Sequence, residues 1–244
     1  MKNIIVIGSG FGGLSIASRL RSKGFNITLI EKQNDLGGRA RTFVHNGYKY
    51  DAGPTVITAP YLINELFTIH SDKLSNHVNL LPVKPWYRFL FDNGEYLDYG
   101  DKLSSTVREI KSKYGYGDAK GYVKLLKHSK RIFNKAFIEL ADEPFETMGS
   151  MMKHLPELLR IRFDRSVYKA VDMHFSNKNL SQALSMHPLL VGGNPYSTTS
   201  IYLLIQYLEW KWGVYYSEGG TGKIIDALEN LLINKGVEIK KNTE

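Results

Sequence analysis

Four glycines within the six-residue run Gly8-Ser9-Gly10-Phe11-Gly12-Gly13 restrict the local structure more than any other segment of the chain. The apolar residues just before the run, Asn3–Ile7, predict a short buried strand. Apolar residues after the run recur at helical spacing, at Leu14, Ala17 and Leu20. A G-x-G-x-x-G sequence between a strand and a helix is typical of a dinucleotide-binding turn.

Each position of this run has an expected role. Gly8 permits the tight turn, Gly10 lets a pyrophosphate approach the backbone, and Gly13 allows close packing of the helix on the strand. The exposed amides, including those of Ser9 and Gly12, and the positive helix end would then hold the phosphates.

A second apolar run at 27–30 follows Gly24, which is expected to end the helix, so the opening reads as a β-α-β unit. Glu31 ends the second strand, about 20 residues beyond the motif, where an acid accepts hydrogen bonds from an adenosine ribose. An acid at this position disfavours a 2′-phosphate. Strand, helix and Glu31 together predict dinucleotide binding.

Composition excludes several kinds of chemistry. The 244 residues contain no cysteine, which excludes disulfides, iron–sulfur clusters and thiol nucleophiles. The seven histidines are scattered without ligand spacing, so no metal site is expected. Redox chemistry in this chain must therefore belong to an organic cofactor.

The net charge of +8 favours anionic partners, but no helix-turn-helix, zinc-finger or RNA-stacking signature accompanies it, so no nucleic-acid partner is expected. The glycines argue against a signal peptide, and no apolar run reaches the roughly 18–20 residues of a membrane span. We expect a cytoplasmic chain, soluble or peripheral at the inner face of the membrane.

The pattern of elements suggests three stretches of chain. Residues 1–81 would hold the β-α-β unit and a hairpin at 42–44 and 48–50, turning at Asn46-Gly47. Residues 82–211 read as a mostly helical insert that starts with strands at 86–91 and 95–98. Its expected helices are 104–113, 119–140, 148–159 and 180–187. Residues 212–244 predict a strand at 214–216, a helix at 221–233 and a strand at 237–240, repeating the opening order.

The arrangement of Gly8 to Gly13, Gly24, Glu31 and Gly37-Gly38-Arg39 resembles the opening of flavin amine oxidases and carotenoid desaturases. This resemblance implies an α/β, Rossmann-like FAD-binding fold with an inserted helical substrate domain, and FAD as the cofactor. It also implies that Gly38 and Arg39 bind the cofactor, with charge-assisted bonds from Arg39 to the phosphates.

Three further segments resemble phytoene desaturases, and the resemblance covers essentially the whole chain. The first is Asp51-Ala52-Gly53-Pro54-Thr55. The resemblance implies that Gly53, Pro54 and Thr55 lie beside the flavin ring, although an ordinary turn is the alternative. The other two are the stretch from His187 to Val214 and Gly219-Gly220-Thr221-Gly222. Pro188 and Ser217 depart from the family pattern, without affecting the nucleotide motif.

The implied activity is FAD-dependent desaturation of phytoene towards lycopene, in which the cofactor performs the difficult step. The alternatives are a diapophytoene desaturase, another carotenoid desaturase or isomerase, and a non-catalytic fragment of a split enzyme. His187 and Glu209 are polar candidates, but structural roles suit both better, so the catalytic base is unassigned. The chain resembles the N-terminal half of the family, so a missing C-terminal half is an expected partner, and the chain alone is expected to be inactive.

Apolar residues at helical spacing alternate with basic ones over 151–175, where Arg160, Arg162 and Arg165 lie. This pattern predicts either a basic amphipathic segment on a membrane surface or a core-facing helix with a solvated face. Resemblance to membrane-associated desaturases favours membrane contact, which would suit a polyene substrate taken from lipid.

Overall fold

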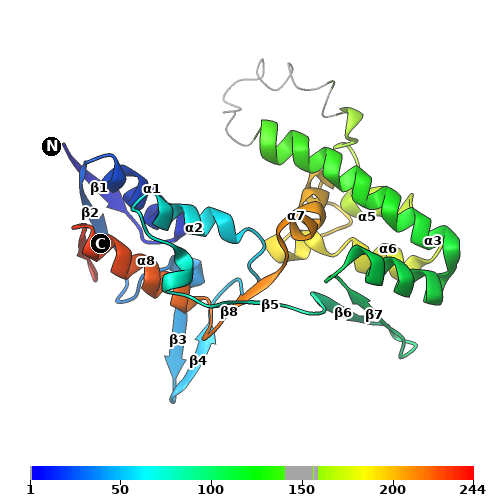
Figure 1. The fold of residues 1–244 in the computed structure, drawn as a ribbon, viewed down its shortest axis with the longest axis horizontal. Coiled ribbons are helices and arrows are strands. Elements are labelled where there is room, and N and C mark those ends of the chain that lie inside the picture. The colour runs from blue at the N-terminus through cyan, green and yellow to red at the C-terminus, as the bar shows by residue number, and fades with distance from the viewer. Residues whose placement is uncertain (1, 141–155, 157–158) are drawn as a thin grey trace. The chain divides into compact units, whose positions relative to one another are not determined.

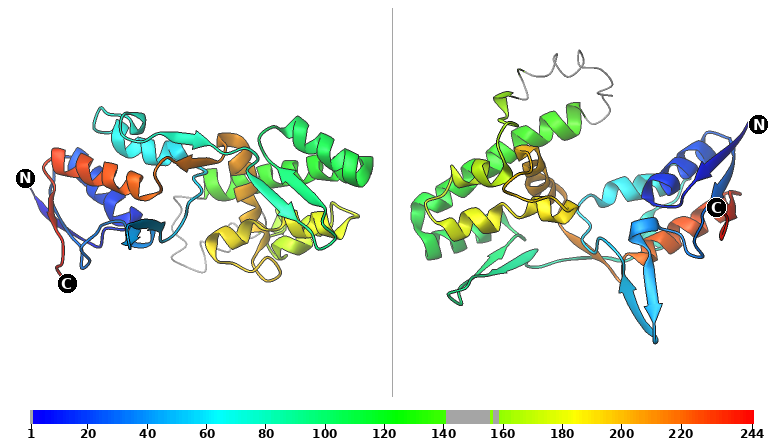
Figure 2. Two further views of the ribbon diagram at one scale, coloured as in Figure 1. Left: turned by 90° about the horizontal axis from the view of Figure 1, so that it is seen from below. Right: turned by 180° about the vertical axis from the view of Figure 1, so that it is seen from behind.

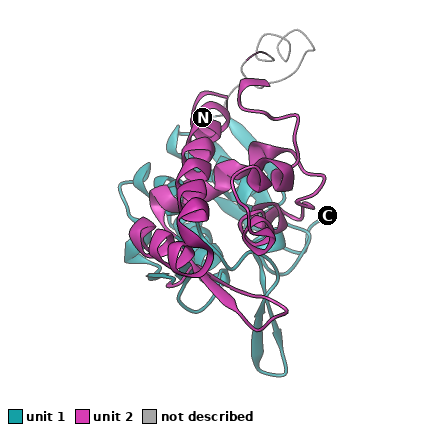
Figure 3. Cartoon of the chain, turned by 90° about the vertical axis from the view of Figure 1, so that its right-hand side faces the viewer, with its two compact units in different colours: residues 1–83, 214–244 teal, residues 84–213 magenta. Residues whose placement is uncertain are grey.

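The computed structural model describes residues 2–140, 156 and 159–244, which form two compact units (Figures 1 and 3). Unit 1 comprises Met1–Val83 and Val214–Glu244, and unit 2 comprises Lys84–Gly213. The chain therefore leaves the first unit and later returns to it. The unit boundaries lie two residues beyond the expected limits at 81 and 211.

Unit 1 is built on a parallel three-stranded sheet in the order β1-β2-β9. Strand β1 is Asn3–Ile7, β2 is Asn26–Ile30 and β9 is Glu238–Lys240. Helix α1 (Phe11–Ser22) connects β1 to β2, and α8 (Gly222–Asn234) precedes β9. The predicted β-α-β unit and the return of the chain to it are confirmed.

Only one face of this sheet is buried. Val6, Ile27 and Leu29 lie in a core shared with α1 and α8, whereas Ile5 is 64% and Ile7 86% exposed. The prediction of a buried first strand is therefore correct for one face and wrong for the other. Because strand side chains alternate between faces, a continuous apolar run does not reveal which face is covered.

The predicted hairpin is confirmed as β3 (Thr42–His45) and β4 (Tyr48–Asp51). Asn46 and Gly47 have φ values of 50° and 82°, which a two-residue hairpin turn favours. Figure 2 shows this hairpin from two further sides, extending away from the sheet of unit 1.

The strand expected at 214–216 is β8 (Tyr215–Ser217), but it pairs antiparallel with β5 (Leu80–Pro82) and not with the parallel sheet. The predicted order of strand, helix and strand is therefore confirmed, but β8 lies outside the parallel sheet. Unit 1 also contains elements that the sequence did not reveal: η1 (Gly38–Ala40), α2 (Pro60–Thr68) and η2 (Leu74–Asn76).

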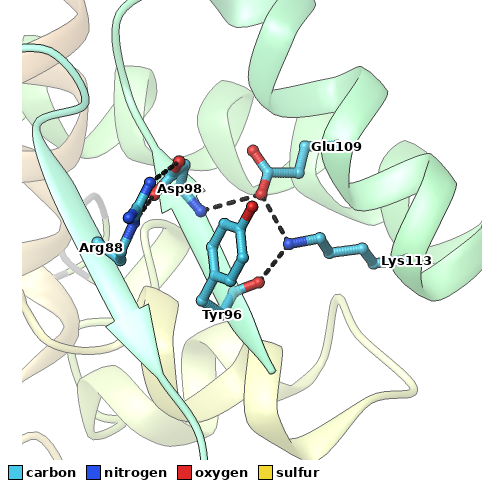
Figure 4. A network of polar contacts seen from close by, with 5 residues as sticks. All are labelled: Arg88, Tyr96, Asp98, Glu109 and Lys113. Carbon is cyan, nitrogen blue, oxygen red and sulfur yellow. Dashed lines mark hydrogen bonds and ion pairs between the residues drawn. The ribbon is translucent and has the colours of Figure 1, made fainter. Parts of the chain in front are cut away.

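Unit 2 begins with the antiparallel pair β6 (Tyr87–Leu90) and β7 (Tyr96–Tyr99), as predicted. Polar contacts fasten this pair to helix α3 (Figure 4). Glu109 of α3 accepts a hydrogen bond from the Asp98 amide and pairs with Lys113, which donates to the Tyr96 carbonyl. Across the two strands, Arg88 pairs with Asp98 at 2.6 Å.

Helix α3 (Leu103–Phe133) joins the two helices predicted at 104–113 and 119–140 across a kink, where Gly115 has φ 91° and ψ 174°. Glycine adopts such a backbone without steric cost, so the expected separation appears as a kink. A π-helical turn, η3 (Asn134–Glu139), follows α3. The helix expected at 148–159 lies almost entirely outside the described residues.

The remaining helices of unit 2 are short. The helix expected at 180–187 is α6 (Lys178–Leu184) followed by the 3-10 turn η4 (His187–Val191). Helix α5 (Val167–Asp172) lies within the amphipathic segment predicted over 151–175, whereas η5 (Ser200–Leu203) and α7 (Leu204–Trp212) were not predicted.

The continuous amphipathic helix expected over 151–175 is absent from its described part, 159–175. Arg162 has a positive φ of 60°, and Ser166 caps a separate helix, α5, by accepting a hydrogen bond from the Lys169 amide. Val167 and Val171, expected on a lipid-facing side, are fully buried in the protein. The core-facing interpretation is therefore correct for α5. No helix among the described residues is both long and apolar enough to cross a membrane.

Candidate cofactor site

The glycine turn has the geometry that a bound pyrophosphate needs. Gly8 has φ 89°, and a Cβ on Gly13 would lie 1.8 Å from the Gly8 carbonyl oxygen, so α1 packs too closely for any side chain there. A Cβ on Gly10 or Gly12 would meet no described atom within 4 Å. The backbone is therefore open at the start of α1, where helix amides attract anions.

Glu31 lies beside the turn and is 7% exposed. Its Oε2 atom accepts hydrogen bonds from the Ser9 amide at 2.9 Å and the Ser9 hydroxyl at 2.5 Å, while Oε1 accepts from the Gln33 amide at 2.9 Å. Burial alone would raise the pKa of the Glu31 carboxyl, but these hydrogen bonds outweigh it and lower the pKa. Glu31 is thus held ionised against the turn.

The Gly37-Gly38-Arg39 segment packs directly on the turn. The Gly37 amide donates to the Ser9 carbonyl at 2.9 Å, and a Cβ on Gly38 would lie 3.1 Å from the Gly10 Cα. Arg39 is exposed and forms no ion pair with any residue that the structure describes. A cation placed after two closely packed glycines is available to an anionic ligand.

The Asp51–Thr55 segment is attached to the same assembly. A Cβ on Gly53 would lie 2.1 Å from the Arg39 carbonyl oxygen, so only glycine allows this approach. Gly53, Pro54 and Thr55 are all exposed. The structure thus brings every predicted cofactor-binding residue into unit 1. There the Gly37–Arg39 segment contacts the glycine turn, and Gly53 contacts Arg39.

Two residues hold this segment to the N-terminal end of α8. Asp51 accepts hydrogen bonds from the Thr42 hydroxyl at 2.9 Å and the Thr221 amide at 3.2 Å. The Thr221 hydroxyl donates to the Pro54 carbonyl at 2.6 Å. Sequence reasoning noted both motifs but assigned neither residue a role, since no local spacing relates positions 51 and 221.

A small, mainly apolar cavity of about 230 Å³ adjoins these elements. Phe11, Pro54, Ile57 and Thr221 are among its lining residues. The glycine turn, Glu31 and Arg39 could hold the phosphates and ribose of a dinucleotide. The cavity could hold a largely apolar ring attached to it. The residues present therefore fit FAD.

His187 and Glu209 are brought together in unit 2, away from the glycine motif in the chain. The His187 Nε2–H donates to Glu209 Oε2 at 3.1 Å, and the Tyr87 hydroxyl donates to Glu209 Oε1 at 2.8 Å. The side chains of His187 and Glu209 are 1% and 0% exposed. Full burial and mutual pairing favour the structural interpretation for both residues.

In the described part of the chain, no three histidine or acidic side chains lie close enough together to form a set of metal ligands.

Comparison with known proteins identifies the family of this chain. Residues 11–244 match the family of flavin containing amine oxidoreductases. The chain is 40% identical over 242 residues to a lycopene-forming phytoene desaturase of Pseudescherichia vulneris, covering 99% of this chain and 49% of that protein. It is 30% identical to a 4,4'-diapolycopen-4-al dehydrogenase of Metabacillus indicus, covering 98% of this chain and 49% of that protein.

Among solved structures, a putrescine oxidase bound to putrescine matches with a TM-score of 0.62 and 15% identity, covering 99% of this chain and 51% of that one. At this identity the likeness concerns the fold alone, and it agrees with the Rossmann-like class expected from the sequence. The chain spans about half the length of the curated relatives it matches.

Proposed function

The chain belongs to the flavin containing amine oxidoreductase family, and from that premise we propose that it carries the FAD-binding part of a carotenoid desaturase acting on phytoene. The observation that carries the proposal is the continuous assembly of Gly8–Gly13, Glu31, Gly37–Arg39 and Gly53–Thr55. Family and fold both support FAD as the cofactor.

Different residues of unit 1 would bind different parts of FAD. The open amides at the start of α1 and the Arg39 guanidinium would hold the two phosphates, whose charge they match. The Glu31 carboxylate would accept a hydrogen bond from a ribose hydroxyl in addition to those it accepts from Ser9. Gly53 and Pro54, held by Thr221, would lie along the flavin.

FAD held by these residues would supply the two-electron oxidation that converts a single bond of the polyene to a double bond. The chain's contribution is to bind the cofactor, orient it and exclude water. Buried His187 and Glu209 are assigned no part in this step.

Desaturation of phytoene to lycopene is favoured over other reactions by the 40% identity to a lycopene-forming relative. The second candidate is an enzyme acting on a diapocarotenoid, supported by the 30% identity to a diapolycopenal dehydrogenase. We place either enzyme at the inner surface of the cytoplasmic membrane, because a polyene hydrocarbon resides in lipid. A further part, corresponding to the other half of the relatives, would complete the substrate site.

The test is expression in a phytoene-accumulating bacterium. The 244-residue chain would be produced alone and fused to the C-terminal half of the Pseudescherichia vulneris relative, and carotenoids would be separated by chromatography. We expect conjugated products from the fusion only, because catalysis needs the flavin held against the polyene from both sides.

A fusion that carries Arg39→Ala is the matched control and should lose FAD together with colour. Coloured product from the 244-residue chain alone would refute the requirement for a second half. A fusion that retains FAD but leaves phytoene unchanged while converting a diapocarotenoid would favour the second candidate.

A further inference from the structure

A basic depression lies in unit 2, outside the cofactor assembly. Its volume is about 320 Å³, and it is bounded by α3, by residues 160–162 and by the end of α5. Five of its lining side chains are permanently cationic: Lys124, Lys127, Arg131, Arg160 and Arg162. We call this depression the basic pocket.

None of these five cations forms an ion pair with a carboxylate in the described ranges 2–140, 156 and 159–244. Two acids of unit 2 that the structure describes have other partners. Asp172 pairs with Lys178 at 2.8 Å, and Asp118 accepts from the Ser176 and Asn177 amides. Like charges gathered without counterions repel one another, so a bound anion would stabilise the pocket.

Two histidines, His128 and His174, also line the pocket, with ring centroids 5.8 Å apart. Burial lowers the pKa of both rings, that of His174 to about 4. The charged neighbours act in the same direction: His128, Lys124 and Arg162 on His174, and Arg162 and Arg131 on His128. Both rings are therefore neutral near pH 7, mainly because they are buried, and the neighbouring cations add to the effect.

We propose that the basic pocket binds a phosphate-bearing anion. Phosphate suits it because several oxygens can accept hydrogen bonds from lysine and arginine at once, and because two negative charges offset more of the repulsion than one. The volume lies at the low end for small-molecule sites, which favours a compact ligand or a lipid headgroup over a long polymer. The pocket belongs to unit 2, so the proposal is independent of FAD binding and of desaturation.

The first test measures binding of inorganic pyrophosphate by calorimetry to the 244-residue chain carrying Arg39→Ala, which removes the phosphate-binding cation proposed in unit 1; this chain is the parent of the variants below. Lys127→Gln with Arg131→Gln removes two pocket cations from α3. Arg108→Gln with Lys120→Gln removes two exposed cations from the same helix outside the pocket. We expect the pocket variant to bind about tenfold more weakly or worse, and the control to stay within about twofold of the parent.

Binding should also take up protons, because a bound anion raises the pKa of His128 and His174. The measured heat at a fixed pH should therefore depend on the ionisation enthalpy of the buffer, and this dependence should be smaller in a variant with His128→Gln and His174→Gln. The pocket variant without ligand should unfold within a few degrees of the parent, because Lys127 and Arg131 are exposed and the lost repulsion offsets the lost interaction of Arg131 with the end of α3. This measurement separates loss of binding from loss of folding.

The second arm distinguishes the two sources of phosphate. Co-sedimentation with phosphatidylcholine vesicles, with and without phosphatidylglycerol, tests a lipid headgroup, and pyrophosphate tests a soluble ligand. Either signal supports the proposal if the pocket variant loses it and the control keeps it. Equal losses in both variants, or no binding of the parent to either probe, would overturn it. Binding of a single-stranded oligonucleotide in preference to both probes would also overturn it.

Discussion

At the scale of single residues, Glu31 holds the glycine turn and is the proposed ribose acceptor. Its carboxylate accepts three hydrogen bonds from Ser9 and Gln33, so its loss both frees the turn and removes a ribose acceptor. Glu31→Gln in the fusion protein should weaken FAD retention by roughly 1.5–3 kcal/mol for each charged bond lost, measured as flavin content after purification. Gln33→Ala is the control, because its contact uses only the backbone amide; equal flavin content in both variants would contradict the assignment.

Glu31 should also make stability depend on pH. Its folded-state pKa lies below the ordinary value of 4.5. Its contribution is therefore complete above pH 4.5 and is lost as the pH falls through the folded pKa. Urea unfolding should show a smaller loss of stability below pH 4.5 in Glu31→Gln than in the parent, and parallel curves would be inconsistent with this role.

Glu209 is the second residue with a large predicted effect. Glu209→Ala leaves the Tyr87 hydroxyl and the His187 ring without their buried acceptor, so the free energy of unfolding should fall by about 3–5 kcal/mol. Glu209→Gln keeps an acceptor oxygen and should lose only about 1–3 kcal/mol. Exposed Glu139, paired with Lys135, is the control, and Glu139→Ala should cost about 0.5 kcal/mol or less by urea unfolding. A similar cost at both glutamates would show that the buried pair is absent.

At the scale of elements, the start of α1 separates folding from binding. Gly13→Ala places a Cβ 1.8 Å from the Gly8 carbonyl oxygen, so α1 must move away from β1 at a cost of roughly 1–3 kcal/mol or more. Gly12→Ala places its Cβ in open space and should stabilise the helix by about 0.4–1 kcal/mol, while crowding the phosphates and weakening FAD binding. Thermal unfolding and flavin content measure the two effects, and the prediction fails if the two variants behave alike.

At the scale of the whole molecule, the uncovered face of the parallel sheet should govern solution behaviour. Ile5 and Ile7 are exposed, and such apolar surface promotes association. Ile5→Thr with Ile7→Thr should reduce self-association of the 244-residue chain in light scattering while leaving the strand intact, because threonine is β-branched. Val6→Thr, on the buried face, should instead lower stability. Unchanged scattering in the double variant would remove this face as the cause.

The local elements of this protein were predictable from the amino-acid sequence. The glycine run, helical spacing and Asn46-Gly47 act within a few residues of chain, so they predicted β1, α1, β2 and the β3–β4 hairpin. Glu31 follows β2 directly, where an acid can accept hydrogen bonds from a ribose, so it predicted dinucleotide binding for the same reason. Short elements without strong periodicity, such as α2 and α7, were missed because packing, more than local propensity, stabilises short helices.

Only the tertiary structure decided which distant residues meet. It paired β8 with β5, buried Val167 and Val171, and joined Asp51 to Thr221. It also gathered five cations from separate segments around one pocket. Such contacts depend on the free energy of packing the whole chain, in which solvent exclusion and long-range pairing outweigh the preferences of any single segment.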